Sequence, residues 1–307
     1  MVMEGLSTTL RAKLESKLDN AAQAFLYEGR PDAPDFAQPP GEAALYAPDS
    51  VSWRIFKNPV SLFIGGVAAV ILELAEPRVC AGVWNHSNFR EDPVARLKRT
   101  GLAAMITVYG ARSVSVPMIE MITRMHDRVT GITDRGLPYH ANDPELLNWV
   151  QATAAFGFLE AYSAYVYPLS DAEHDRGLLE GQASASLYGA AIAPKSRGEL
   201  ASLFEAMTPQ LEASPIIFEF LDIMRRARAL PQPIWLTQRL FVRAAVEITP
   251  PAIRARLGLG RRYGLRPLEK LVLRRMGRRA DRIKLLSGPA AQASLRLGLP
   301  ADYVYRR

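Results

Sequence analysis

The chain has little of what several common classes of protein require. Its 307 residues include one cysteine, Cys80, which can neither form an internal disulfide nor build a thiolate cluster for zinc or iron–sulfur. None of the four histidines belongs to a His-Glu-x-x-His helix or a local two-histidine, one-carboxylate triad. A Gly-x-Ser-x-Gly elbow and a P-loop are also missing, so hydrolase and nucleoside-triphosphate chemistry have no support.

Targeting and membrane signals are equally scarce. Residues Met1 to Ser7 lack the basic and apolar regions of a secretory signal, and one cysteine suits a reducing compartment, so we expect a cytoplasmic protein. The most apolar run, Ser61 to Leu74, contains Gly65-Gly66 and is interrupted by Glu73. It is shorter than the roughly 20 residues that a bilayer-spanning helix needs. We predict a buried core helix there.

The overall composition is that of a folded protein, with 49% hydrophobic and 22% charged residues. Strand signals are poor, because no alternating β-branched run is joined to an Asn-Gly or Asp-Gly turn. Only Val114 to Val116 fits a short extended piece. We therefore predict an all-α fold, and without an internal repeat or linker we expect residues 1–307 to form a single domain.

Helix signals, in contrast, recur along the chain. Thr8 to Glu28 has the spacing of a peripheral helix, and the proline-rich segment from Pro31 to Pro48 predicts a loop or an extended wrap. Asp143-Pro144 is a suitable N-cap and first helical residue for a helix that should run to about Val166. Ser-x-x-Glu capping boxes predict two further helix starts, at Ser170 to Glu173 and at Ser196 to Glu199.

A cation-rich stretch offers the first candidate site residues. Arg96, Arg99 and Thr100 are spaced i, i+3 and i+4, so they share one face if Pro93 starts a helix. Two guanidinium groups and a hydroxyl would then point the same way. From the residues alone, the favoured interpretation is an ordinary surface helix, with Arg99 in water and Arg96 paired to the acidic residues before Pro93.

His126 is the second candidate. It follows Ile122 and precedes Val129 at helical spacing, on the apolar stripe of a helix predicted from near Pro117 to Gly131. We expect its side chain to face inward. An inward histidine is most often a hydrogen-bonded core residue, but imidazole on a helix is also a frequent ligand of haem iron, and one histidine suffices for haem.

The net charge of +7 arises largely in the C-terminal third. A solvated face is the favoured interpretation, because Leu268, Leu271, Val272 and Met276 form an amphipathic helix pattern that needs a polar side. A peripheral membrane contact is the alternative, whereas the scarcity of interleaved aromatics argues against nucleic acid. The cations are Arg261, Arg262, Arg266, Lys270, Arg274, Arg275, Arg278, Arg279, Arg282 and Lys284.

A set of short motifs runs in a fixed order from about Trp53 to Phe204. It comprises Leu72-Glu73-Leu74-Ala75-Glu76-Pro77, Gly82-Val83, His86-Ser87, Arg96-Leu97-Lys98-Arg99-Thr100, His126 with Val129 and Gly131, Tyr139 with Ala141, and Leu146-Leu147 with Trp149-Val150. In this order and spacing the chain resembles a family of bacterial and fungal proteins. That family includes latex-clearing protein, a rubber oxygenase, and the fungal oxygenase that cleaves the farnesyl chain of a mycophenolic acid precursor. Residues 205–307 would form a basic helical extension of this core.

The resemblance implies a globin-like helical core that holds one b-type haem. His126 occupies the position of the proximal iron ligand, and Arg96 and Thr100 match the arginine and threonine beside the haem, which we take as the catalytic candidates. Dioxygen would bind opposite His126 for the oxygenation or cleavage of an apolar alkene. In the cytoplasm, a small isoprenoid, a lipid or a natural-product intermediate is the expected substrate class.

The chain departs from the family pattern at several positions. Arg99 replaces a lysine that can ligate iron, and a guanidinium has no free lone pair, so we expect Arg99 to pair with a haem propionate instead. Gln151 stands where relatives often have histidine. The distal glutamate of the family falls near Val79 to Gly82, where this chain has no carboxylate, and its role is not transferred to Glu73 or Glu76.

Two alternatives to an oxygenase therefore stay open. The chain could bind haem without turnover, as a sensor or carrier, since the distal lysine and glutamate of the family are both missing at their positions. It could also be a helical interaction protein without haem that docks its C-terminal cations on anionic membranes.

Overall fold

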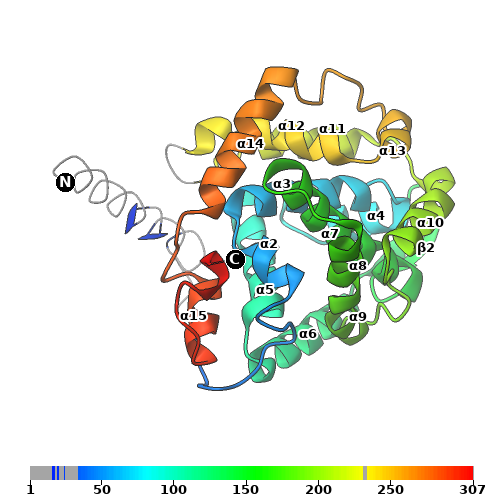
Figure 1. Cartoon of the computed structure of the whole chain (residues 1–307). Helices are drawn as coiled ribbons and strands as arrows, with labels where there is room; N and C mark the ends of the chain where they lie inside the picture. Colours follow the sequence, from blue (N-terminus) through cyan, green and yellow to red (C-terminus); the bar gives the residue numbers. More distant parts are fainter. Residues whose placement is uncertain (1–15, 18, 21–23, 25–33, 231–233, 307) are drawn as a thin grey trace.

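The computed structural model describes residues 16–17, 19–20, 24, 34–230 and 234–306. This part is built almost entirely of α-helices, and its sheet structure consists of one two-stranded ribbon (Figure 1). The all-α prediction is confirmed. The elements in chain order are α2 (Val51–Phe56), α3 (Pro59–Glu73), α4 (Pro77–Asn85), α5 (Pro93–Tyr109), α6 (Arg112–His126), β1 (Thr130–Ile132), β2 (Pro138–His140), α7 (Pro144–Tyr165), α8 (Asp171–Glu180), α9 (Gln182–Leu187), α10 (Arg197–Met207), η1 (Thr208–Gln210), α11 (Pro215–Arg226), η2 (Ile234–Thr237), α12 (Gln238–Ile248), α13 (Pro251–Arg256), α14 (Pro267–Asp281), α15 (Pro289–Arg296) and η3 (Tyr303–Tyr305).

Proline and short polar side chains set the helix starts. Eight of the described helices begin with proline, where the missing N–H is harmless because the first helical N–H groups have no partner in the helix. Asn58 caps α3 by accepting hydrogen bonds from the N–H groups of Val60 and Ser61. Asp92 caps α5 in the same way, by accepting from the N–H of Ala95.

The predicted helix ends in the middle of the chain are confirmed. Asp143 caps α7 by accepting from the N–H of Glu145, and α7 ends at Tyr165. Both hydrogen bonds of the capping box form at Ser170 to Glu173. At the start of α10, Ser196 accepts from the N–H of Glu199, but the Glu199 carboxylate bonds the residue before the cap, so that box is only half formed.

The N-terminal predictions fall partly within the described residues. Most of the predicted helix from Thr8 to Glu28 lies outside them. Residues 34–48 contain no helix or strand, as predicted, and they pack against α15. Gln292 accepts from the N–H of Phe36, and Arg296 donates to the Phe36 carbonyl oxygen at 2.8 Å. The proline-rich segment is therefore a wrap that the C-terminal helix holds in place.

Helices α3 and α7 form the most extensive helix pair in the described structure. Two glycines face each other at this contact. A Cβ on Gly65 would lie 2.7 Å from the carbonyl oxygen of Gly157, and a Cβ on Gly157 would overlap the carbonyl oxygen of Gly65. The backbones therefore touch directly, and only residues without a side chain allow this approach.

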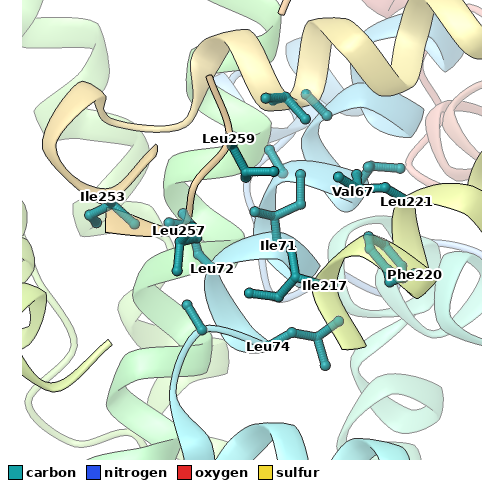
Figure 2. Packing of buried hydrophobic residues seen from close by; sticks show 14 of the residues in the cluster. Val67, Ile71, Leu72, Leu74, Ile217, Phe220, Leu221, Ile253, Leu257 and Leu259 are labelled. Carbon is teal, nitrogen blue, oxygen red and sulfur yellow. The ribbon is translucent and has the colours of Figure 1, made fainter. Parts of the chain in front are cut away.

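The core extends from α3 toward the C-terminal helices. Figure 2 shows Ile71 of α3 beside Ile217 of α11, and Leu72 of α3 beside Leu257, which follows α13. A second cluster fixes α5 to α2, where the Trp53 indole donates to the Val108 carbonyl oxygen at 3.1 Å. The predicted core helix from Ser61 to Leu74 is confirmed, because it coincides with most of α3.

The prediction for the helix that carries His126 was partly wrong. Helix α6 begins at Arg112 rather than near Pro117, and it includes Val114 to Val116, which are not extended. Val114 packs against a buried cluster there, and such tertiary packing overrides the extended preference of β-branched residues. Pro117 is accommodated inside the helix at an exposed position.

The C-terminal end of α6 also differs from the expectation. The helix ends at His126, and Gly131 belongs to β1, where it pairs with Tyr139 of β2. A Cβ on Gly131 would lie 2.7 Å from the Cζ atom of the Tyr139 ring. The glycine therefore makes room for this ring rather than ending the helix, and two short strands escaped the prediction.

In the described part of the chain no single helix is long and apolar enough to cross a bilayer. Taken together, α3 and α4 are long and apolar enough for one bent span by length and composition alone, and they are bent by 114° at the break between them.

The contact between α3 and α7 predicts a large cost for a small change. Gly157→Ala should destabilise the protein by about 3 kcal/mol or more, because the new methyl group meets a backbone carbonyl that cannot move alone. Gly66→Ala is the matched control on α3, since a Cβ at Gly66 meets nothing within 4 Å, and it should raise stability by about 0.5 kcal/mol. Urea unfolding of both variants measures the difference, and equal stabilities would contradict the direct backbone contact.

Candidate functional site

Helix α5 presents Arg96 and Thr100 on one face, as the sequence predicts for a helix that starts at Pro93. Arg96 Nη1 donates to Thr100 Oγ1 at 2.7 Å, and Thr100 Oγ1 donates to the Arg96 carbonyl oxygen at 3.0 Å. Arg96 is half-buried and Thr100 is exposed. The hydroxyl therefore holds the guanidinium along the helix.

The acidic neighbour of Arg96 comes from α3 rather than from the start of α5. The half-buried Glu73 is the last residue of α3, and its carboxylate interacts electrostatically with Arg96. Thr153 of α7 lies beside the same carboxylate. Within the described residues Arg96 makes no ion pair with the acidic residues before Pro93, so the simple surface-helix interpretation is wrong for Arg96.

Burial gives Glu73 an unusual protonation behaviour. Loss of solvent raises the pKa of its carboxyl from 4.5 to about 7, although Arg96 and the Thr153 hydroxyl both lower it. The same burial lowers the pKa of Arg96, with a smaller contribution from the charge of Arg99. Near neutral pH Glu73 thus exchanges a proton readily beside a fixed cation.

His126, the last residue of α6, is half-buried and lies close enough to Arg96 to feel the electrostatic effect of its charge. Burial lowers the pKa of His126 below its usual 6.5, and the positive charge of Arg96 lowers it further. The imidazole is therefore neutral at pH 7, and one of its ring nitrogens keeps a free lone pair. Neutral imidazole is the form that binds metal ions.

Asn142, in the turn between β2 and α7, supports His126. Its Nδ2 donates to the carbonyl oxygen of Thr123 at 2.9 Å and to Asp127 Oδ1 at 2.6 Å, so it holds the end of α6. Its side chain also lies near His126 and raises the pKa of the imidazole, against the stronger effect of burial. The amide oxygen of Asn142 is buried, and it has no hydrogen-bond partner among the described residues.

Arg99 lies apart from this group. Its side chain is exposed, and Nη2 donates to Asn88 Oδ1 at 2.7 Å, in the loop before α5. Its charge nevertheless reaches Arg96. Arg99 thus stands at the rim of the candidate site, formed by Glu73, Arg96, Thr100, His126 and Asn142.

The sequence matches one protein-family model over most of its length. Residues 53–282, more than half of the sequence, match the model described as ER-bound oxygenase mpaB/B'/rubber oxygenase, catalytic domain. The chain belongs to this oxygenase family. The predicted resemblance is confirmed, and the chain is accordingly an oxidoreductase. Comparisons with curated proteins and with solved structures give no match.

In this oxygenase family a metal or haem cofactor is expected, and the described residues limit where it could bind. No three His, Cys, Asp or Glu side chains come together there as a metal site. Two surface clefts, of about 650 and 500 Å³, lie beside α11 and among α7, α8, α10 and α13. Neither is lined by Arg96, Thr100 or His126, so the candidate site is distinct from both.

Sequence reasoning found three of the site residues and missed two. Glu73 was noticed as the interruption of an apolar run, and the role of the family's distal glutamate was not transferred to it. A carboxylate at the end of a core helix is the signal that could have found it. Asn142 carries no such signal, because its importance arises from the fold of the β2–α7 turn against α6. The predicted roles of Arg96, Arg99, Thr100 and His126 remain predictions.

The raised pKa of Glu73 predicts how stability depends on pH. Because the folded state holds this proton more tightly than the unfolded chain, the contribution of Glu73 to stability is full below pH 4.5 and is lost as the pH rises through about 7. The free energy of unfolding of the wild type should fall by about 2 kcal/mol between these limits, allowing for solvent screening, and Glu73→Gln should not show this fall. Urea unfolding at a series of pH values measures it. Glu120→Gln, at an exposed position on α6, is the control, and parallel profiles for wild type and Glu73→Gln would contradict the assignment.

Proposed function

We propose that this family member is a haem-dependent oxygenase that acts on an apolar alkene, such as an isoprenoid, a lipid or a natural-product intermediate. The observation that carries the proposal is a neutral, half-buried His126 at the end of α6, close enough to Arg96 of α5 for the charge of the guanidinium to lower the pKa of the imidazole further than burial does. The family description supports the substrate class, because it names a rubber oxygenase and rubber is an apolar polyalkene.

The residues of the candidate site fit a b-type haem. A haem iron needs one proximal protein ligand, and His126 offers a neutral imidazole on a helix. The amide oxygen of Asn142, buried and without a hydrogen-bond partner among the described residues, would accept the N–H of that ring and so leave the opposite nitrogen to the metal. Arg96 and Arg99 provide guanidinium groups for the propionates, the first half-buried and the second at the rim.

When bound, the haem would supply the activation of dioxygen for oxidation of the alkene. The chain's own residues would govern charge and protons beside it. Arg96, held by Thr100, keeps a fixed positive charge next to Glu73. With a pKa of about 7, Glu73 can accept or release a proton at working pH, which suits a general acid or base.

A second candidate is a haem-binding protein without turnover. One observation favours it, because Arg99 is exposed and bonded to Asn88 and cannot act as the distal lysine of relatives does. Oxygen consumption separates the two candidates. The oxygenase should consume dioxygen in the presence of an isoprenoid alkene and stop doing so in Glu73→Gln, whereas the carrier would bind haem and consume none.

His126→Ala tests the cofactor directly. The wild-type protein, expressed with a haem precursor, should show a Soret band, and the variant should lose it because the iron has lost its protein ligand. His86→Ala is the matched control, since His86 is exposed and bonded only to Tyr139 among the described residues. Circular dichroism verifies that all three proteins fold. If neither wild type nor His86→Ala shows a band even after haem titration, the proposed cofactor is wrong.

Two substitutions at Asn142 separate support of His126 from support of α6. Asn142→Ala removes the acceptor and should weaken haem binding about tenfold. Asn142→Asp keeps an acceptor for the imidazole but loses the donors to Thr123 and Asp127, so it should retain most of the affinity. Haem titration followed by absorbance measures both. An equal loss in the two variants would mean that Asn142 acts only by holding the end of α6.

A further inference from the structure

Helix α14 turns an unusual face outward. Leu273, Gly277 and Asp281 form its buried side, and Gly277 lies so close to α7 that a Cβ there would overlap the Tyr165 carbonyl oxygen. On the opposite side Leu268 is 77% exposed, and Leu271 and Val272 are each 49% exposed. At i, i+3 and i+4 these three side chains form one apolar patch on the outer face. In Figure 1 the helix lies at the edge of the molecule, among the C-terminal elements.

Arginines continue the same outer face beyond the apolar patch. Arg275 and Arg279 follow Leu271 and Val272 by one and two turns. Both are exposed, and neither side chain has a hydrogen bond or ion pair to a described residue. The neighbouring arginines, Arg274 and Arg278, make hydrogen bonds within the protein. Arg274 donates to the carbonyl oxygen of Ala164 at 3.0 Å, and Arg278 donates to that of Val166 at 3.1 Å, so these two hold the end of α7.

The acidic side chains of this segment do not neutralise the outer face. Glu269 pairs with Arg243 of α12 at 3.1 Å, and Asp281 pairs with the buried Lys57 at 3.2 Å. Residues 261–284 contain ten Lys and Arg but only these two acidic residues. The other parts of the chain hold 28 basic and 29 acidic residues, so the excess charge of the protein is concentrated in this segment.

We propose that the outer face of α14 docks on the surface of an anionic lipid bilayer. Leu268, Leu271 and Val272 would enter the interface between headgroups and acyl chains, and Arg275 and Arg279 would contact lipid phosphates. This inference is independent of the proposed cofactor. It would bring the enzyme to the phase in which apolar alkenes dissolve.

Charge and composition favour this partner over two others. In a symmetric dimer through this face, the interface would enclose Arg275 and Arg279 of both copies, and the acidic residues of α14 are already paired with Arg243 and Lys57, so the net interaction is repulsive. A nucleic acid would satisfy the arginines, but it offers nothing to three exposed aliphatic side chains, and the face carries no aromatic ring for base stacking. A bilayer with anionic headgroups offers an apolar interface to the three aliphatic side chains and phosphate groups to the two arginines.

Vesicle flotation tests the proposal with the full chain. Wild type should bind vesicles of phosphatidylcholine mixed with phosphatidylglycerol, bind them less in high salt, and bind phosphatidylcholine alone weakly. Arg275→Gln with Arg279→Gln should weaken binding roughly 30-fold. Leu268→Ser, Leu271→Ser and Val272→Ser together should reduce it further. The controls are Arg112→Gln with Lys195→Gln for exposed charge and Ile192→Ser for an exposed side chain that is 80% accessible.

A labelled single residue gives a second readout that does not depend on the stability of multiple variants. Cys80 is buried, and burial raises the pKa of its thiol to about 11, so a maleimide dye should label Leu271→Cys selectively. Fluorescence of an environment-sensitive dye there should shift to the blue on addition of anionic vesicles, and the same dye at Ile192→Cys should not respond.

Several results would overturn the proposal. Wild type could fail to bind anionic vesicles, or binding could be unchanged in both α14 variants. The dye could respond equally at the two positions. Sedimentation equilibrium could show a dimer that the leucine substitutions dissociate, or α14-dependent binding could be found for an oligonucleotide and not for vesicles. Each of these would assign the face to another partner or to none.

Discussion

The direct contact of Gly65 with Gly157 is the constraint on which much of the structure depends. It brings α3 and α7 backbone to backbone, and this sets how far apart the next turns of the two helices lie. One consequence is that Trp149 of α7 reaches the carbonyl oxygen of Leu72 at 3.2 Å, which ties down the end of α3. The other is that Thr153 lies beside the Glu73 carboxylate. The position and the protonation of Glu73 therefore follow from how closely these helices pack.

The electrostatic balance of the candidate site follows from burial and from one half-buried cation. Burial raises the pKa of Glu73 and lowers the pKa of His126, while Arg96 limits the rise at Glu73 and adds to the lowering at His126. The Thr100 hydroxyl fixes the direction of that guanidinium. In a protein interior such charges are costly unless they compensate one another, which explains why residues from α3, α5 and α6 act as a group.

Features that depend on local chemistry were predictable from the sequence, and features that depend on distant packing were not. Asp143 and Pro144 define the start of α7 through their own side chains, and the apolar run ending at Leu74 had to be buried wherever it lay. The start of α6 at Arg112 was missed because packing of Val114 against a distant cluster decides it. The proximity of Glu73 to Arg96 was missed for the same reason, since residues 23 positions apart meet only through the fold.

Helix α7 connects the candidate site to α14. Its middle carries Thr153 beside Glu73, and the carbonyl groups at its C-terminal end accept from Arg274 and Arg278 of α14. The close approach of Gly277 to Tyr165 makes that junction a second backbone contact of the kind that joins α3 to α7. Because backbone contacts leave little freedom to slide or rotate, α14 cannot act as a loosely attached tail. Its outer arginines are exposed because they lie away from the buried side formed by Leu273, Gly277 and Asp281. The hydrogen bonds of Arg274 and Arg278 to α7 hold that outer face in a fixed orientation relative to Glu73 and Arg96.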